Sequence, residues 1–325
     1  MARERVIEEI ATLIPGDIDP EELNVPQIYP TTLSRHNVVV TDHSGEAIAC
    51  TRSTIESPLT QNITDPVPLL WVPGYGGIKP AYRRPREGSA QDGRISVTWR
   101  PVRDLSLLNT FKPSNLRHPE LLPRRTLEAV INNVCEQTES DQVDLACHSM
   151  GGFIAALAAA KDPSKIRNLV LVASAGLERH SLKTLARRSI PFVRGEFIPH
   201  FHTLREENEA RMALEALDYF LRNPLRTLAE GLAVANCNIV DDLDRIRNAG
   251  IMIGGLLFAS DELFIEANVR DQSEHLFHIL DTFDDGSVGH MGPQLHGQAV
   301  AHAVVDITQR LNLASEALPV ARLIL

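Results

Sequence analysis

The stretch ACHSMGG, from Ala146 to Gly152, places a serine between an apolar run and a run rich in alanine. The run before it, QVDL, is typical of a buried strand, and the run after it, FIAALAAA, is typical of a helix. A side chain at such a strand-to-helix turn stands at the carboxyl edge of a sheet, beside the free N–H groups of the helix. Ser149 at the apex is therefore a candidate nucleophile.

A turn this sharp strains the apex residue and needs small residues two positions before and two positions after it, because larger side chains would collide with adjacent chain. Gly151 fits the second position, but Cys147 occupies the first, where glycine is usual. Cysteine is still small, so we expect a strained turn with Cys147 buried beneath it as an unreactive thiol. His148 precedes the apex, and its side chain is expected to point away in a structural role.

The elements that must position this turn alternate between strand and helix from about residue 67 onward. Such alternation predicts an α/β fold, a mostly parallel sheet with helices on both faces. Earlier, HNVVVTD and EAIACTRS predict an antiparallel pair joined by the turn HSGE. The later strands are expected at LLWV, 93–100, QVDLAC, IRNLVLVASA, IMIGGLLF and LDTFD, and the helices at 124–138, 152–161, DDLDRIRNAG and roughly 293–311.

This alternation is interrupted between residues 177 and 240, where no convincing strand is found. ENEARMALEALDYFLRNP has an apolar stripe that includes Leu217 and Phe220, and LRTLAEGLAVAN predicts a second helix. A helical block inserted between two strands is expected to cover the carboxyl edge of the sheet as a cap. The expected organisation is an N-terminal helical extension at 1–32, an α/β core at 33–176 and 241–325, and a helical cap at 177–240.

Composition and charge narrow the possible partners. The 325 residues include 32 basic and 42 acidic side chains, and the net charge of −10 argues against a nucleic-acid partner. Charges interrupt the N-terminal MARERVIEEIATLIPGD, and no later run approaches about 18 apolar residues, so neither a signal peptide nor a membrane span is predicted. The four cysteines lack metal-type spacing and are expected to be reduced thiols of a cytoplasmic protein.

Two local motifs resemble those of the α/β-hydrolase superfamily of serine hydrolases, in the group with a helical cap after the sixth sheet strand. CHSMGG is similar to the GHSMGG elbow of that family, with Ser149 at the nucleophile position. WVPGYGG (71–77) resembles its HGxGG oxyanion loop, with Pro73 where histidine is commonest. The resemblance implies oxyanion donors at the backbone N–H groups of Tyr75 and Met150. The supporting glycines of the two motifs are Gly74, Gly76, Gly77 and Gly151.

A third, distributed motif extends the resemblance over about residues 37–312 and implies the partners of Ser149. Asp261 in GLLFASDELF follows a strand end, and His290 in GSVGHMGPQ precedes the last helix. Serine, aspartate and histidine follow one another in the chain order of this fold. A serine hydroxyl is a poor nucleophile until an imidazole takes its proton, and a carboxylate fixes the tautomer of that imidazole. The motif thus implies an acyl-enzyme at Ser149.

Other histidines and acids compete with His290 and Asp261. The rival histidines, all expected within the last two helices, are His275, His278, His296 and His302. The rival acids are Asp284 and Asp285 near the last strand, Asp241, Asp242 and Asp244 at a helix start, and Glu262. His200 and His202 lack an acidic or cysteine partner at ligand spacing, so no metal site is predicted.

We therefore expect a serine hydrolase that needs no cofactor and cleaves a carboxylic ester or related acyl substrate beneath the cap. The apolar stripe of the cap suits a hydrophobic small molecule. Carbon–carbon bond hydrolases, thioesterases, acyltransferases and cofactor-free haloperoxidases share the triad and remain alternatives, as does a non-catalytic ligand-binding member of the fold. Epoxide or haloalkane chemistry would need an aspartate in place of Ser149. The oligomeric state stays open.

Overall fold

The computed structural model describes residues 32–41, 47–56, 66–74, 82–101, 117–198, 224–284, 286 and 289–322 of the chain. The N-terminal helical extension expected at 1–32 lies outside these residues, except for Thr32, which begins the first strand. The cap helix expected around Leu217 and Phe220 also lies outside them, as does the turn HSGE.

A single eight-stranded sheet forms the centre of the described part of the chain, with the order β1-β2-β4-β3-β5-β6-β7-β8. β1 pairs antiparallel with β2, β2 pairs antiparallel with β4, and every pairing from β4 to β8 is parallel. The predicted antiparallel pair is therefore confirmed. The strands are β1 (Thr32–Thr41), β2 (Ala47–Glu56), β3 (Leu69–Val72), β4 (Ser96–Pro101), β5 (Val143–His148), β6 (Ile166–Val172), β7 (Met252–Phe258) and β8 (Ile279–Phe283).

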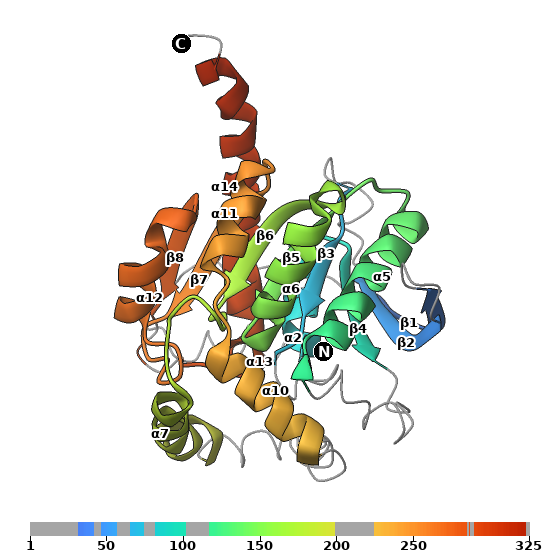
Figure 1. Cartoon of the computed structure of the whole chain (residues 1–325). Coiled ribbons are helices and arrows are strands. Elements are labelled where there is room, and N and C mark those ends of the chain that lie inside the picture. Colours follow the sequence, from blue (N-terminus) through green and yellow to red (C-terminus); the bar gives the residue numbers. More distant parts are fainter. Residues whose placement is uncertain are drawn as a thin grey trace, which may run out of the picture. The chain divides into compact units, whose positions relative to one another are not determined.

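Apolar side chains cover both faces of the parallel strands. In β3, Leu70 and Val72 pack with helices on one face, whereas Leu69 and Trp71 pack on the other. This two-sided burial explains why the parallel strands are apolar nearly throughout. Figure 1 shows α5, α6 and α11 along one face and α14 behind the sheet. The helices on the two faces are α5 (Leu121–Thr138), α6 (Met150–Lys161), α11 (Val240–Asn248), α2 (Arg83–Gln91) and α14 (Gly297–Arg322).

Among the described residues, three helical segments lie between β6 and α11. They are α7 (Leu182–Phe192), the π-helix η4 (Val193–Phe197) and α10 (Pro224–Asn236), which matches the second helix predicted for the inserted block. α7 and α10 lie side by side (Figure 1). Pro191 lies near the end of α7, where it removes one backbone hydrogen bond, and the chain continues in the wider turn of η4.

The C-terminal helices differ in detail from the prediction. The helix expected at 293–311 is divided into α13 (Gly292–Leu295) and α14, with a break at His296, and α14 continues to Arg322. α12 (Glu266–Ser273) ends before His278, so the expectation of a helical His278 was wrong; its Nδ1 instead accepts the N–H of Ile253 at 3.0 Å. None of the helices within the described ranges is long and apolar enough to cross a membrane.

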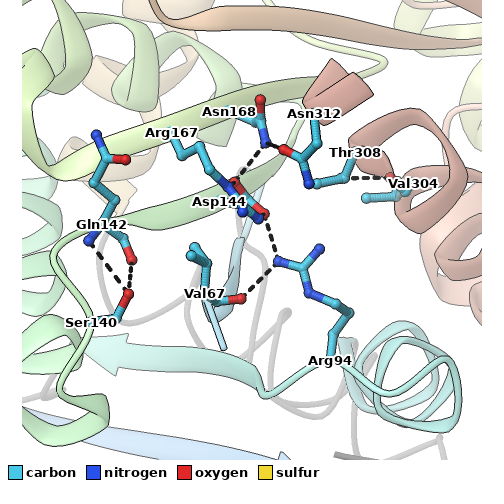
Figure 2. A network of polar contacts seen from close by, with 10 residues as sticks. All are labelled: Val67, Arg94, Ser140, Gln142, Asp144, Arg167, Asn168, Val304, Thr308 and Asn312. Atoms are coloured by element: carbon cyan, nitrogen blue, oxygen red, sulfur yellow. Dashed lines mark hydrogen bonds and ion pairs between the residues drawn. The ribbon is translucent and has the colours of Figure 1, made fainter. Parts of the chain in front are cut away.

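A buried polar network lies at the amino edge of the sheet, the edge at which the parallel strands begin (Figure 2). Asp144 at the start of β5 is fully buried, and its carboxylate accepts hydrogen bonds from Arg94, Arg167 and Asn168. Asn168 also donates to Asn312 of α14 at 2.8 Å. The network therefore connects the parallel strands to the helix behind them. Because it lies at the amino edge, its role is structural.

Candidate active site

Ser149 lies at the turn between β5 and α6, at the carboxyl edge of the sheet. Its backbone has φ 54° and ψ −125°, outside the conformations that a serine readily adopts. Two backbone hydrogen bonds hold this geometry: the N–H of Ser149 donates to the carbonyl of Val172, and its own carbonyl accepts from Ala175, each at 3.1 Å. The predicted strained turn is thus present, and it is fastened to the end of β6.

The space around the turn explains its glycines. A Cβ on Gly151 would lie 2.6 Å from the carbonyl oxygens of Val72 and Pro73, so only glycine lets α6 start against β3. A Cβ on Gly74 would lie 2.9 Å from the Cβ of Ser149. Cys147, which takes the usual place of a glycine, is fully buried. Burial raises the pKa of its thiol well above the ordinary value, in keeping with the expected unreactive side chain.

The structure brings Ser149, His290 and Asp261 together. Nε2 of His290 lies 3.0 Å from Oγ of Ser149, and its Nδ1 lies 2.9 Å from Oδ2 of Asp261. All three residues are buried, each with at most 6% of its surface exposed. The carboxylate requires the proton on Nδ1, which leaves Nε2 to accept the hydroxyl proton of Ser149.

Backbone donors hold Asp261 in place just after β7. Its Oδ1 accepts the N–H groups of Leu263 at 2.8 Å and Phe264 at 3.0 Å, while Oδ2 faces His290. The ring of Phe264 then packs edge-on against the imidazole of His290, with 5.2 Å between the ring centres. The same short loop therefore orients the carboxylate and covers the histidine.

The pKa of His290 is raised above the ordinary 6.5. Burial alone would lower this pKa, but the charge and hydrogen bond of Asp261 outweigh it, and the charge of Glu196 adds to them. Glu196, in η4, accepts the backbone N–H of His290 at 2.9 Å. One carboxylate thus binds the imidazole of His290, and a second binds its backbone N–H.

A second chain of hydrogen bonds runs behind the triad. Nε2 of His148 lies 2.9 Å from the carbonyl oxygen of His290, so this nitrogen carries the proton. Nδ1 of His148 must then accept, and the hydroxyl of Tyr82 donates to it at 2.6 Å. The same hydroxyl accepts the N–H of Gly74 at 2.9 Å. The ring of His148 lies against the ring of His290, with 4.9 Å between their centres. Burial lowers the pKa of His148 well below the ordinary value.

Comparison with known proteins agrees with this fold. A family model for the alpha/beta hydrolase fold matches residues 28–223, more than half of the chain. The chain belongs to the α/β-hydrolase family. A search of curated proteins finds no match.

Solved structures show the fold of this α/β-hydrolase in proteins of low sequence identity. A membrane phospholipase A, a bacterial virulence factor, is 19% identical, with a TM-score of 0.59 over 86% of this chain and 87% of that one. A thermophilic esterase from Thermogutta terrifontis is 15% identical, with a TM-score of 0.55 over 86% and 99% of the two chains. A bromoperoxidase from Bacillus anthracis is 12% identical, with a TM-score of 0.58 over 84% and 100%.

Only some residues of the oxyanion hole predicted for this α/β-hydrolase lie within the described part of the chain. Tyr75, Gly76 and Gly77 lie outside the described residues. Met150 is the first residue of α6, so its N–H has no carbonyl partner within its own helix. The N–H of Gly74 is engaged by Tyr82, so it is not a donor for an oxyanion.

The rival residues have other environments in the part of the chain that is described. His302 binds Asp92 at 2.6 Å, Asp284 accepts the N–H of Gly286, and Glu262 is exposed. Asp285, His200 and His202 lie outside the described residues. Within those residues, no group of three or more histidines, cysteines or acids could hold a metal ion.

Sequence reasoning missed Tyr82 and Glu196. Tyr82 precedes a helix of no recognisable motif, and Glu196 lies in a segment that was expected only to be helical. Both residues are far in sequence from the site residues that they contact, and local sequence patterns do not reveal such contacts.

Proposed function

We propose that this α/β-hydrolase cleaves a carboxylic ester or related acyl substrate through an acyl-enzyme at Ser149. One observation carries the proposal: the hydroxyl of Ser149, the imidazole of His290 and the carboxylate of Asp261 form one buried chain of hydrogen bonds, with the hydroxyl on a strained turn. His290 is the proposed general base and acid, and Asp261 orients it.

In the first step, Nε2 of His290 takes the hydroxyl proton as Oγ of Ser149 attacks the ester carbonyl carbon. The electron pair of the C=O bond moves to its oxygen, for which the backbone N–H groups of Met150 and Tyr75 are the proposed donors. One such donor typically lowers the barrier by about 3 kcal/mol. The intermediate then expels the alcohol, which receives the proton from His290. Water repeats the sequence on the acyl-enzyme and releases the acid.

The proposed substrate is a hydrophobic small molecule, and the segment 177–240 is the proposed cap over it. Large apolar side chains on α7 and α10 support this proposal, because Ile190 and Leu228 are 55% and 61% exposed. The reaction as proposed needs no cofactor or metal. A cytoplasmic location stays a prediction from the sequence.

A fluorophosphonate probe, which reacts with an activated serine, tests the proposal. Wild-type protein should be labelled once and should hydrolyse p-nitrophenyl esters, and Ser149→Ala should lose both activities. Ser174→Ala is the matched control, since Ser174 is buried beside α6 and its hydroxyl donates to the carbonyl of Ala175 rather than to His290. Folded wild-type protein that resists labelling would refute the proposal.

The alternatives that share the triad differ in substrate and acceptor. A substrate panel separates them. It contains p-nitrophenyl esters of graded chain length, acyl thioesters, substrates with a cleavable carbon–carbon bond, and an ester offered together with an alcohol as acyl acceptor. Ester hydrolysis faster than the other reactions, and absent in Ser149→Ala, is the expected result. A labelled serine without turnover of any substrate would instead favour the ligand-binding alternative.

A further inference from the structure

Glu196 reaches the catalytic loop from outside the α/β core. It lies in η4, the π-helix that follows α7, and only 7% of its surface is exposed. Its Oε1 accepts the N–H of His290 at 2.9 Å, and its Oε2 accepts the N–H of Met291 at 2.8 Å. Both carboxylate oxygens therefore bind successive backbone groups of the loop that carries the catalytic histidine.

The loop is shaped to receive this carboxylate. A Cβ on Gly289 would lie 2.0 Å from Oε1 of Glu196, a distance that no side chain could occupy. Gly289 thus lets the carboxylate approach the backbone closely. Hydrogen bonds to a charged acceptor are stronger than hydrogen bonds between neutral groups. Two such bonds from successive peptide units fix the direction of the backbone that follows.

The same segment also contacts the loop of Asp261. Arg188 of α7 donates to the carbonyl of Leu263 at 3.0 Å and pairs with the buried Glu178 at 2.8 Å. Leu263 in turn donates its N–H to Asp261. Phe192, at the end of α7, packs edge-on against the imidazole of His290, with 5.8 Å between the ring centres. The segment α7–η4 therefore holds both partners of Ser149.

The charges around His290 come from three elements. Asp261 follows β7, His148 ends β5 and Glu196 lies in η4. Burial lowers the pKa of His290, while the charges of Asp261 and Glu196 raise it. The groups that face Glu196 are His290 and Asp261, and Glu262 lies near the adjacent Gly195. Burial raises the pKa of Glu196, whereas its two backbone bonds and the charge of His290 lower it.

We propose that Glu196 is a positioning residue of the triad: its carboxylate holds the backbone of the His290 loop and places a second negative charge near the catalytic histidine. The proposal rests on the proposed function of Ser149. On this proposal the segment α7–η4 aligns the catalytic histidine in addition to covering a substrate, because His290 is aligned only while η4 is in place.

The isosteric variant Glu196→Gln tests the proposal. Its amide keeps one acceptor oxygen but presents an N–H group to the second backbone N–H, and it carries no charge. The rate of fluorophosphonate labelling at Ser149, measured from pH 5 to 9, should fall about 10- to 100-fold on its plateau through misalignment of His290. The midpoint of its acid limb should also move to lower pH, because the imidazole loses a charge that raises its pKa.

Glu262→Gln is the matched control, since it removes one negative charge next to Asp261 from an exposed side chain. It should change neither the plateau nor the midpoint. A Glu196→Gln variant with a slower plateau but an unmoved midpoint would overturn the proposal, because it would show a purely structural role. Unchanged labelling would overturn it as well. Thermal unfolding of each variant confirms that the compared proteins are folded.

A measurement that needs no catalysis separates this inference from the proposed function. The imidazole signals of His290, assigned by their loss in His290→Ala, can be titrated by NMR in wild-type and Glu196→Gln proteins. A lower pKa of His290 in the variant supports the inference, and an equal pKa overturns it. If wild-type protein resisted the fluorophosphonate, the proposed function would fail, and the titration would still decide whether Glu196 acts on His290.

Discussion

The hydroxyl of Tyr82 donates to Nδ1 of His148 across 2.6 Å and accepts the N–H of Gly74 at 2.9 Å. Because His148 also binds the carbonyl of His290, this pair joins the glycine loop, the nucleophile turn and the histidine loop. One buried phenol therefore ties together three segments that converge on Ser149. Burial raises the pKa of Tyr82, so the hydroxyl keeps the proton that it donates.

Tyr82→Phe should destabilise the protein and slow its reaction at Ser149. The change leaves Nδ1 of His148 and the N–H of Gly74 without this partner, and unsatisfied buried groups of this kind cost about 1–3 kcal/mol each. Urea unfolding and the rate of fluorophosphonate labelling measure the two effects. Ser89→Ala is the control: Ser89 lies on α2, the helix that Tyr82 precedes, and the change removes the buried hydrogen bond that its hydroxyl accepts from Trp71 of β3. It should lower stability but leave the labelling rate unchanged; equal rates in all three proteins would contradict the prediction.

The pH dependence of labelling should follow His290. The imidazole must be neutral to take the proton of Ser149, and its pKa is raised above 6.5. The rate should therefore rise with pH, with its acid midpoint above pH 6.5. A midpoint below that value would show that the carboxylates around His290 do not outweigh its burial.

Asp261→Asn should slow labelling roughly 10⁴-fold, because the amide no longer fixes the tautomer of His290. It should also move the acid midpoint to lower pH, since the charge and hydrogen bond of Asp261 raise the pKa of His290. Asp284→Asn serves as the comparison, because Asp284 accepts only the N–H of Gly286 among the described contacts. A similar fall in the labelling rate of both variants would contradict the assignment of Asp261 as the acid of the triad.

Cys147 should resist iodoacetamide in the native protein. Its side chain is fully buried, and burial raises the pKa of the thiol, so little reactive thiolate is present. Peptide mass spectrometry should find Cys147 unmodified until urea unfolds the protein. Rapid modification of Cys147 under native conditions would show that the turn around Ser149 is placed incorrectly.

Asp144→Asn should reduce stability without affecting the site. Removing one partner of a buried ion pair typically costs about 3–5 kcal/mol, and Asp144 accepts from two arginines (Figure 2). Urea unfolding should show this loss, while labelling at Ser149 per folded molecule stays the same. Asp141→Asn, at an exposed residue just before β5, should be neutral. A loss of labelling in folded Asp144→Asn would show that the two edges of the sheet are coupled.

Local sequence determined the strands and the nucleophile turn. The central parallel strands β3, β5, β6 and β7 were predictable because each is a short, mostly apolar run buried on both faces. The turn was predictable because Gly151 follows Ser149 at the required spacing. Helix ends were predicted less well: α6 begins at Met150 rather than at 152, and α14 continues to Arg322. Helix ends depend on packing that periodicity does not report.

Only the tertiary structure decided what supports the triad. Asp261 and His290 were expected from the resemblance of their motifs to those of the family, but the partners of His148 and the backbone contacts of Glu196 were not. Tyr82 meets His148 across 66 residues, and Glu196 meets His290 across 94. Such contacts depend on how strands and helices are stacked, because a lone tyrosine or glutamate in a sequence carries no sign of the buried group that it will bind.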